Sequence, residues 1–311
     1  RGGVSSLALT RFLETLPQRR VAPGKRAPEV RALLPVGGVP ARGGDPGELL
    51  TEATRLLIDH SLFNGHPRFW GYITSSAAPI GALADLLAAA VNPNLGGWPL
   101  SPVASEIEAQ TVRWIAELVG FPANSGGLLV SGGNMANFVC FLAARRAGAP
   151  WDVRVEGMQG ARGRARVYVS AETHTWVEKA ADLFGLGTDA VRWIETDDGQ
   201  RMDPEALEAA IDHDRETGDL PLLVVGTGGS VSTGAIDPLP ELRRICDERS
   251  LWLHVDGAYG AFAALLPDAP PDLKALATAD SVALDPHKWL YAPLEAGCAL
   301  VRDAEALHDT F

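Results

Sequence analysis

The sequence predicts an α/β fold in which helices cover both faces of a mostly parallel sheet, and three observations lead to that prediction. From residue 166 onward, short β-branched or apolar runs alternate with helical stretches. The runs are largely apolar on both faces, as in strands buried on both sides. The helices have readable starts, because Asp203-Pro204-Glu205 supplies an N-cap, a first-turn proline and an acid. The predicted strands are Val167–Ser170, Leu222–Thr227, Leu251–Asp256 and Ser281–Leu284.

Four further elements are predicted around this pattern. The run Leu128–Val130 predicts a strand that leads through a glycine turn into a helix, and Leu239–Arg249 predicts another helix. Asp303 is expected to cap a helix that opens at Ala304. That helix stops with the chain at Phe311 after about two turns, which indicates a chain cut short.

The N-terminal region differs in composition from the rest. Residues 1–60 are expected to form an arm with short helices, and residues 61–311 one large domain, a division that 311 residues allow at roughly 150 residues per domain. The helix Leu7–Leu16 precedes a stretch to about residue 48 that is crowded with glycine and proline, which predicts extended chain. The Ala-rich run Ala77–Val91 is shorter than the ~20 residues of a membrane span and contains Asp85, so a buried helix is expected.

Composition excludes several classes of protein. The 27 basic and 39 acidic residues give a net charge of −12, which argues against nucleic-acid and anionic-membrane partners because both require basic patches. Three widely spaced cysteines form no disulfide framework, and reduced thiols fit a cytoplasmic protein. The chain begins with Arg1 and lacks the residue order of a signal peptide, so the true N-terminus is left open.

Two predicted strand ends carry small or imidazole side chains. Gly132, Gly133 and Asn134 lie between a strand and a helix, where free N–H groups and the helix dipole attract a phosphate. A plain glycine turn is the alternative. His174 follows the next predicted strand, where a purely structural hydrogen-bonding role is also open.

Two more strand ends carry charged residues. Asp256 ends an apolar strand, where a carboxylate is costly unless it pairs with a cation or donors, and capping the next helix is the alternative. His254 two residues earlier suggests a metal, but no third ligand lies at a suitable spacing, so no metal site is expected. Lys288 follows the last predicted strand beside His287 and Trp289. Burial of this lysine would free its amine as a nucleophile, and a surface lysine is the alternative.

Together these four strand ends supply what is needed to hold pyridoxal 5′-phosphate (PLP). The cofactor requires a lysine for the Schiff base, an acid that keeps the pyridine nitrogen protonated, a flat group against the ring and a turn for the phosphate. No single feature is specific, but the set predicts a PLP enzyme.

At these residues the chain resembles the group II PLP-dependent amino-acid decarboxylases, which include the aromatic-L-amino-acid, tyrosine, histidine and glutamate decarboxylases. The resemblance covers about residues 61–311. It implies the large domain of an aspartate-aminotransferase-type fold (fold type I), an obligate homodimer with its active site at the interface, and a role in amino-acid metabolism. The matching segments are His66-Pro67-Arg68-Phe69, Ser101-Pro102 with Glu106-Ile107-Glu108, Ser131-Gly132-Gly133, His174, His254–Tyr259 and Pro286-His287-Lys288-Trp289.

The resemblance implies a role for each matched residue. Lys288 is expected to form the Schiff base, Asp256 to pair with the pyridine nitrogen and His174 to stack on the ring. The remaining expected cofactor contacts are Ala258 under the opposite ring face, Gly132, Gly133 and Asn134 at the phosphate with His287 nearby, and Thr227 facing the cofactor. The implied reaction is loss of carbon dioxide from an L-amino acid to give the amine.

Three departures from the family pattern stand out. Asp285 occupies a position where the family often has Asn, and a carboxylate near the phosphate is unfavourable unless it is protonated or turned away. Asn134-Met135 replaces Ser or Thr followed by Glu, although Asn can still cap the helix. The family's mobile catalytic loop and small C-terminal domain are absent from this chain. Another fold type I PLP lyase and a truncated, non-catalytic relative are the alternatives.

The substrate is expected to be an aromatic or hydrophobic amino acid. Trp70, Tyr72 and Trp98 lie in segments that resemble those lining the family's side-chain pocket. Core or dimer-interface positions for Trp70 and Trp98 are the alternative.

Overall fold

The computed structural model describes residues 10–34, 37–73 and 75–311. The chain divides into two compact units, residues 1–76 and residues 77–311, and each is described by itself. The division expected after residue 60 falls inside the first unit. Across the described residues, no helix has the length and apolar character needed to cross a membrane.

The first unit is more helical than the sequence indicated. Its glycine- and proline-rich stretch contains α2 (Ala27–Arg31), and α3 (Pro46–His60) follows. Asp45 starts α3 by accepting hydrogen bonds from the backbone N–H groups of residues 47 and 48 at 2.9 and 3.0 Å. The prediction of extended chain up to residue 48 was therefore wrong in part. Residues 10–15 are helical, and the first three residues of the helix expected at Leu7–Leu16 lie outside the described residues.

The second unit is built on a seven-stranded sheet in the order β1-β7-β6-β5-β4-β2-β3. Four strands lie close to the predicted ranges, and β6 matches its range fully. Two others, β3 and β7, were not predicted. The strands are β1 (Gly126–Val130), β2 (Ala165–Ser170), β3 (Val191–Ile194), β4 (Leu220–Thr227), β5 (Trp252–Asp256), β6 (Ser281–Leu284) and β7 (Gly297–Val301).

The direction of the strands brings their carboxyl ends to one edge. Strands β2 to β6 pair in parallel, and β7 pairs antiparallel with both β6 and β1. Therefore β1 runs in the same direction as β6, and within the described residues β7 alone is reversed. The mostly parallel sheet that the sequence predicted is confirmed, and the ends of β1, β2, β4, β5 and β6 lie along one edge.

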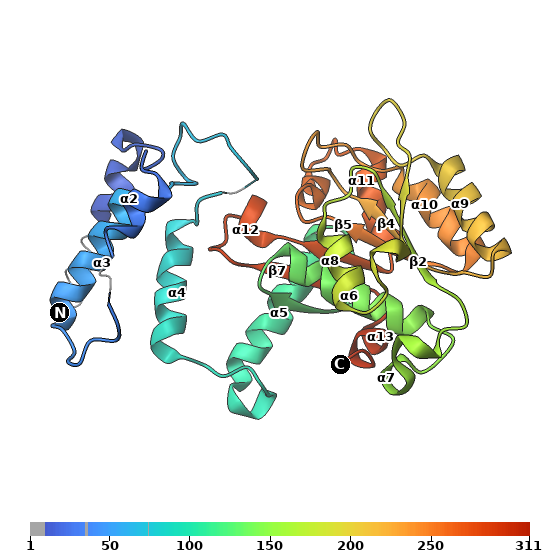
Figure 1. Ribbon diagram of the computed structural model, residues 1–311, viewed down its shortest axis with the longest axis horizontal. Coiled ribbons are helices and arrows are strands. Elements are labelled where there is room, and N and C mark those ends of the chain that lie inside the picture. The colour runs from blue at the N-terminus through green and yellow to red at the C-terminus, as the bar shows by residue number, and fades with distance from the viewer. Residues whose placement is uncertain (1–9, 35–36, 74) are drawn as a thin grey trace. The chain divides into compact units, whose positions relative to one another are not determined.

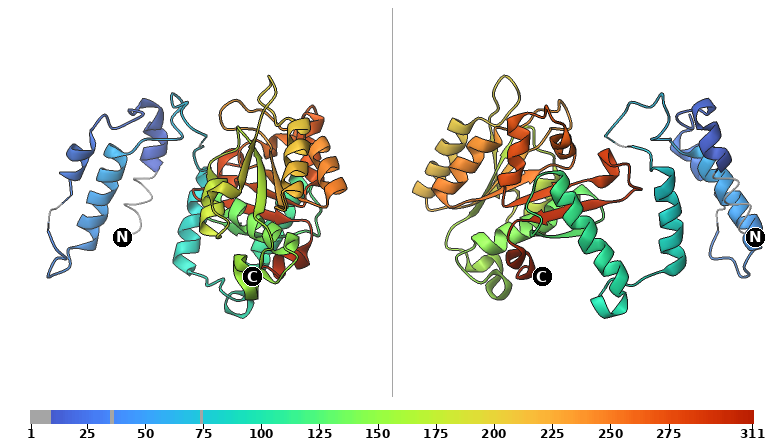
Figure 2. Two further views of the ribbon diagram at one scale, coloured as in Figure 1. Left: turned by 45° about the vertical axis from the view of Figure 1, so that its right-hand side comes forward. Right: turned by 180° about the vertical axis from the view of Figure 1, so that it is seen from behind.

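Helices cover both faces of this sheet (Figures 1 and 2). The connecting helices are α4 (Pro79–Val91), α5 (Pro102–Leu118), α6 (Gly133–Gly148), α7 (Val153–Glu156), α8 (Trp176–Leu183), α9 (Pro204–Glu216), α10 (Leu239–Arg249), α11 (Pro271–Lys274), α12 (Pro286–Trp289) and α13 (Ala304–His308). The predicted caps Asp203 and Asp303 start α9 and α13 by accepting backbone hydrogen bonds.

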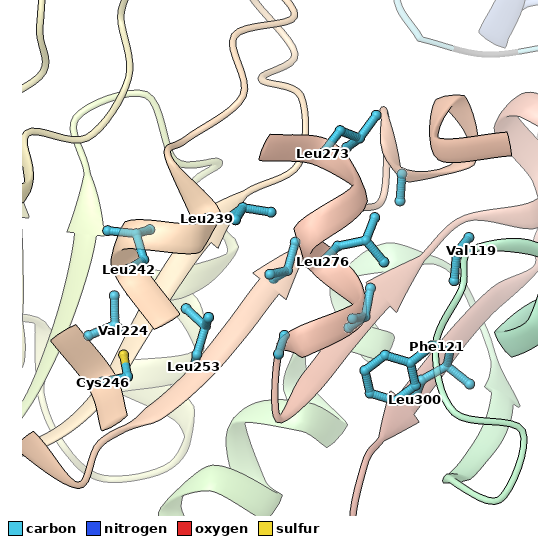
Figure 3. Close-up of a cluster of buried hydrophobic side chains, with 14 of the residues drawn as sticks. Val119, Phe121, Val224, Leu239, Leu242, Cys246, Leu253, Leu273, Leu276 and Leu300 are labelled. Carbon is cyan, nitrogen blue, oxygen red and sulfur yellow. The ribbon is translucent and has the colours of Figure 1, made fainter. Parts of the chain in front are cut away.

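Alternate residues of each strand enter two different cores. On β4, Val224 packs with α5, α9 and α10, whereas Leu223 and Val225 pack with α6 and α8. Figure 3 shows the first of these cores, in which Leu253 of β5 lies among leucines of α10 and of the segments that follow β5. The strand sequences are apolar at successive positions because both faces of the sheet are buried.

Helix α4 corrects the expectation of a buried helix for residues 77–91. The segment is helical, but its large apolar side chains are exposed in the single chain, with Leu83 at 55%, Leu86 at 67% and Leu87 at 63%. Hydropathy predicted the helix correctly. The expectation that it is buried was wrong because α4 extends beyond the sheet core. A contiguous exposed apolar face of this kind indicates an interaction surface.

Candidate active site

The carboxyl edge of the sheet gathers the chemistry-bearing residues. Thr227 at the end of β4 pairs in register with Asp256 at the end of β5, which pairs with Ala283 of β6. The chain leaves β6 directly into the segment Asp285–Lys288, and it leaves β1 into Gly132. The expected residues from four separate stretches of chain therefore converge on this edge.

Asp256 is held by two donors. Its Oδ2 accepts a hydrogen bond from the indole N–H of Trp176 at 2.7 Å, and its Oδ1 accepts one from the backbone N–H of Ala258 at 3.1 Å. Asp256 is 8% exposed and Trp176 is fully buried. Two donors fix the plane of the carboxylate. The backbone bond closes a local turn, and the next helical segment, Ala261–Leu265, has Gly260 as its N-cap, so the alternative that Asp256 caps the next helix is wrong.

Trp176 is the residue that the sequence reasoning missed. Its indole holds Asp256, and its backbone N–H donates to Nδ1 of His174 at 3.3 Å, so one residue contacts both expected partners of the cofactor ring. His174 is exposed, which leaves its ring free to lie against a ligand. The available signal was a large aromatic residue two positions after His174 at the start of a helix.

His254 belongs to a structural hydrogen-bond chain. Trp252 donates to Ser281 Oγ at 2.8 Å, Ser281 lies 2.9 Å from His254 Nδ1, and His254 Nε2 lies 2.7 Å from Asn137 Oδ1. Because an indole N–H can only donate, the Ser281 hydroxyl is left to donate to Nδ1, and Nε2 donates to Asn137. Burial lowers the pKa of His254 to about 4, so the ring is neutral. Both ring nitrogens are engaged, which excludes His254 as a metal ligand.

No cluster of three or more potential metal-ligating side chains occurs in the part of the chain that the structure describes.

The glycine turn before α6 is shaped by close neighbours. Gly132 is the N-cap with φ of +85°, a backbone conformation that favours glycine. A Cβ on Gly133 would lie 2.6 Å from Asp285 Oδ2 and 3.1 Å from the Ala258 Cβ, so only glycine fits there. Asn134 is exposed in the first turn of α6 and does not cap it, which corrects the capping role considered for its side chain.

Lys288 lies in a group of charged residues after β6. Its Nζ lies 2.8 Å from Asp285 Oδ2, and its side chain is 21% exposed, so it is partly accessible rather than fully buried. His287 Nε2 lies 3.7 Å from the same Asp285 oxygen, and His287 Nδ1 accepts a hydrogen bond from the backbone N–H of Ala296. The lysine was expected to be desolvated, and the structure shows it paired with a carboxylate instead.

Thr227 is positioned by a second buried acid. Asp237 accepts hydrogen bonds from the backbone N–H groups of Thr227 and Met202, each at 2.7 Å. Burial raises the pKa of Asp237 to about 6. Asp237 thereby fixes the end of β4, where Thr227 was expected to face the cofactor.

The aromatic residues expected to line a substrate pocket are exposed in the single chain. Trp70 and Tyr72 belong to the first unit and are 90% and 87% exposed. Trp98 is 58% exposed, and its indole donates to Glu106 at 2.9 Å. The core alternative for Trp70 and Trp98 is therefore wrong for the single chain, and their role in a pocket stays a prediction.

The residues present fit PLP. The turn that begins α6 offers backbone N–H groups and leaves no room for a Cβ at Gly133, as a close phosphate requires. Asp256 is a preoriented carboxylate, His174 an exposed imidazole, and Lys288 an accessible amine. These side chains lie at neighbouring strand ends, so one ligand with a phosphate, an aromatic nitrogen and an aldehyde can meet them together.

Known proteins with similar sequences are amino-acid decarboxylases. The chain is 36% identical over 273 residues to an aromatic-L-amino-acid decarboxylase of Bacillus atrophaeus, covering 88% of this chain and 55% of that protein. It is 34% identical over 264 residues to the human acidic amino acid decarboxylase GADL1, covering 85% of this chain and 50% of that protein. The chain thus spans about half the length of these curated relatives.

The fold also matches a solved structure that contains the cofactor. A crystal structure of Oryza sativa TDC with PLP and tryptamine superposes with a TM-score of 0.89 at 26% identity, covering 98% of this chain and 66% of that chain. Residues 37–311 match the model of the pyridoxal-dependent decarboxylase conserved domain. The fold of this chain is of type I, and its cofactor is PLP. The chain belongs to the pyridoxal-dependent decarboxylase family.

Proposed function

We propose that this protein decarboxylates an L-amino acid with an aromatic or hydrophobic side chain and releases the corresponding amine. The observation that supports this most strongly is the convergence of Asp256, His174 and Lys288 at one edge of the sheet. The 36% identity to an aromatic-L-amino-acid decarboxylase supports the substrate class. The similarity to an acidic amino acid decarboxylase makes acidic substrates the alternative that must be tested.

Each residue has a defined task in this proposal. Lys288 attaches the cofactor covalently, and its amine later re-forms that bond so that the product amine is released. Asp256 holds a proton on the ring nitrogen, and His174 covers one ring face while Ala258 packs under the other. When bound, PLP accepts the electron pair that remains at the α-carbon after carbon dioxide leaves. The remaining proposed contacts are Gly132, Gly133, Asn134 and His287 around the phosphate, and Thr227 toward the ring.

The direct test is an assay for carbon dioxide and amine with the PLP-loaded protein. We expect turnover of tryptophan, tyrosine or phenylalanine, whereas turnover of glutamate alone would contradict the substrate class. Amine production without loss of carbon dioxide would indicate a different PLP lyase. No product from any amino acid in a loaded, folded protein would identify a non-catalytic relative.

Asp256→Ala gives the matched test of mechanism. We expect this variant to retain covalent attachment at Lys288 and to lose most turnover, because an unprotonated ring accepts electrons poorly. The loss should fall in kcat rather than in cofactor attachment. Near-normal turnover in this variant would contradict the assignment of Asp256.

We also propose that the protein acts as a cytoplasmic homodimer. The exposed apolar face of α4 supports a second copy as its cover, since such a face is unstable in water. Cys140, Cys246 and Cys298 are buried free thiols, which fits a reducing compartment.

A further inference from the structure

Asp285 is wedged between the lysine and the phosphate turn. One carboxylate oxygen, Oδ2, lies 2.8 Å from Lys288 Nζ and would be 2.6 Å from a Cβ at Gly133. The other oxygen, Oδ1, is buried and has no hydrogen-bond partner, and the residue is 2% exposed. Although Asp285 precedes α12, its side chain does not cap that helix. The carboxyl group of Asp285 is thus held against the first turn of α6 with one oxygen unsatisfied.

The surroundings of Asp285 contain charges of both signs. Lys288 and His287 favour the carboxylate, whereas burial and the negative charge of Asp256 oppose it, and burial raises the pKa of Asp285. Glu295 approaches from the segment before β7, where its Oε2 would be 3.7 Å from a Cβ at Gly132. The first turn of α6 contributes backbone N–H groups and no acidic side chain.

The phosphate of the cofactor must enter this same place. The free N–H groups at the start of a 16-residue helix attract an anion, and the glycine turn lets it approach the backbone. Asp285 already lies against that turn, and in its carboxylate form it brings a second negative charge there. Two like charges cannot share such a site without a proton, as in paired carboxylates.

We propose that Asp285 takes up a proton when the cofactor phosphate binds, so that cofactor loading is coupled to protonation of this site. The protonated carboxyl group donates a hydrogen bond to a phosphate oxygen, and the proton comes from solvent. The ion pair between Asp285 and Lys288 is lost in the same event, and Lys288 gives up its extra proton to solvent before its neutral amine attaches. This inference rests on the proposed PLP site and adds a pH dependence that an Asn at the same position would not have.

The test measures cofactor affinity rather than activity. The probe is 4-deoxypyridoxine 5-phosphate, which carries the phosphate but lacks the aldehyde and so cannot attach to Lys288. If one proton is taken up per phosphate, the dissociation constant should rise about tenfold for each pH unit above the pKa of Asp285. In Asp285→Asn, which keeps the size and an oxygen acceptor for Lys288, this part of the pH dependence should disappear.

A control is available in an exposed acid away from the phosphate turn. Asp182→Asn on α8 removes such an acid, and its affinity should follow the same pH curve as the wild type. At alkaline pH, Asp285→Asn should bind the probe at least tenfold more tightly than the wild type. Equal pH curves for the wild type and Asp285→Asn would overturn the proposal.

A second measurement on the wild type removes dependence on the variant folding. The protons taken up on binding are counted with a pH indicator in weak buffer, for 4-deoxypyridoxine 5-phosphate and for 4-deoxypyridoxine without phosphate. The phosphorylated probe should take up about one proton more, and the excess should vanish in Asp285→Asn. Equal uptake for both probes would overturn the coupling. Absence of binding by the wild type and both variants at every pH would instead contradict the PLP site itself.

Discussion

At the scale of single residues, Trp176 connects the two groups that would hold the cofactor ring. Its indole N–H donates a hydrogen bond to Asp256, and its backbone N–H donates one to the ring of His174. A hydrogen bond to a charged group is worth about 1.5–3 kcal/mol, so this contact contributes measurably to the orientation of the carboxylate. Trp176 is fully buried and acts through Asp256 and His174, so we assign it the role of a positioning residue.

Trp176→Phe tests this role. The substitution keeps an aromatic ring in the core and removes the donor to Asp256, so the protein should fold and bind PLP about tenfold more weakly. The visible spectrum of the bound cofactor should titrate at a different pH, because the ring nitrogen has lost a fixed partner. The control is Trp193→Phe on β3, where the indole is 42% exposed, and its affinity should equal that of the wild type. Unchanged affinity and spectrum in Trp176→Phe would refute the positioning role.

The sequence could predict the residues at the site but not their contacts. Asp256, His174 and Lys288 are recognisable because each follows an apolar strand, and parallel strands end at one edge. The donor to Asp256 could not be predicted, since Trp176 lies 80 residues away in the chain and meets it only through the packing of α8 on β5. The pairing of Lys288 with Asp285 was likewise hidden, although both residues were noticed.

At the scale of elements, a buried ionic cluster joins β2, β3, α9 and the start of β4. Asp214 on α9 accepts hydrogen bonds from Tyr168 of β2 at 2.9 Å and from Arg192 of β3 at 3.0 Å. Arg166 of β2 lies 3.9 Å from Asp214 and also pairs with Asp219. Asp214 is fully buried, so its charge is compensated only by these partners.

Asp214→Ala should therefore destabilise the sheet edge strongly. Removing the acid leaves Arg166, whose side chain is 8% exposed, without its full compensation, and the free energy of unfolding should fall by about 3–5 kcal/mol. Asp212→Ala on the same helix is the matched control. Its carboxylate is 56% exposed and pairs with Arg249, so the loss should stay within about 1 kcal/mol. Chemical denaturation measures the free energy of unfolding of both variants. Equal losses of stability would show that the buried cluster stabilises the protein no more than an exposed ion pair does.

Elements were predicted best where periodicity and caps agreed. The helix at Leu239–Arg249 and the strand at Ser281–Leu284 were identified at their observed limits. The strand β7 was missed because its reversal breaks the alternation of strand and helix on which the prediction relied. The expectation that α4 is buried was wrong for the single chain, because hydropathy indicates that a helix prefers burial but does not indicate which surface covers it.

At the scale of the whole molecule, large apolar side chains are exposed on α4 and on α5. Leu86 on α4 is 67% exposed, and Ile107 and Trp114 on α5 are 59% and 55% exposed. Large apolar faces of this kind on the surface of a single chain mark interaction sites. A second copy of the chain accounts for them within the proposed homodimer.

Leu86→Glu tests the dimer. A charge on the α4 face cannot be buried without a partner, so the wild type should sediment as a dimer and the variant as a monomer. Val155→Glu is the control, because Val155 is 80% exposed on α7 and outside the proposed interface, and it should remain dimeric. A monomeric wild type in analytical ultracentrifugation, or a dimeric Leu86→Glu, would contradict the proposal.

The central claim is that the carboxyl edge of the sheet is a PLP site with Lys288 as its point of attachment, and one measurement tests it most directly. The purified protein is mixed with PLP, reduced with borohydride, digested and analysed by mass spectrometry, with Lys288→Ala alongside. We predict a visible absorbance band before reduction and label on Lys288 in the wild type, with neither in the variant. Label on another lysine, or no band from a folded wild-type protein, would contradict the account.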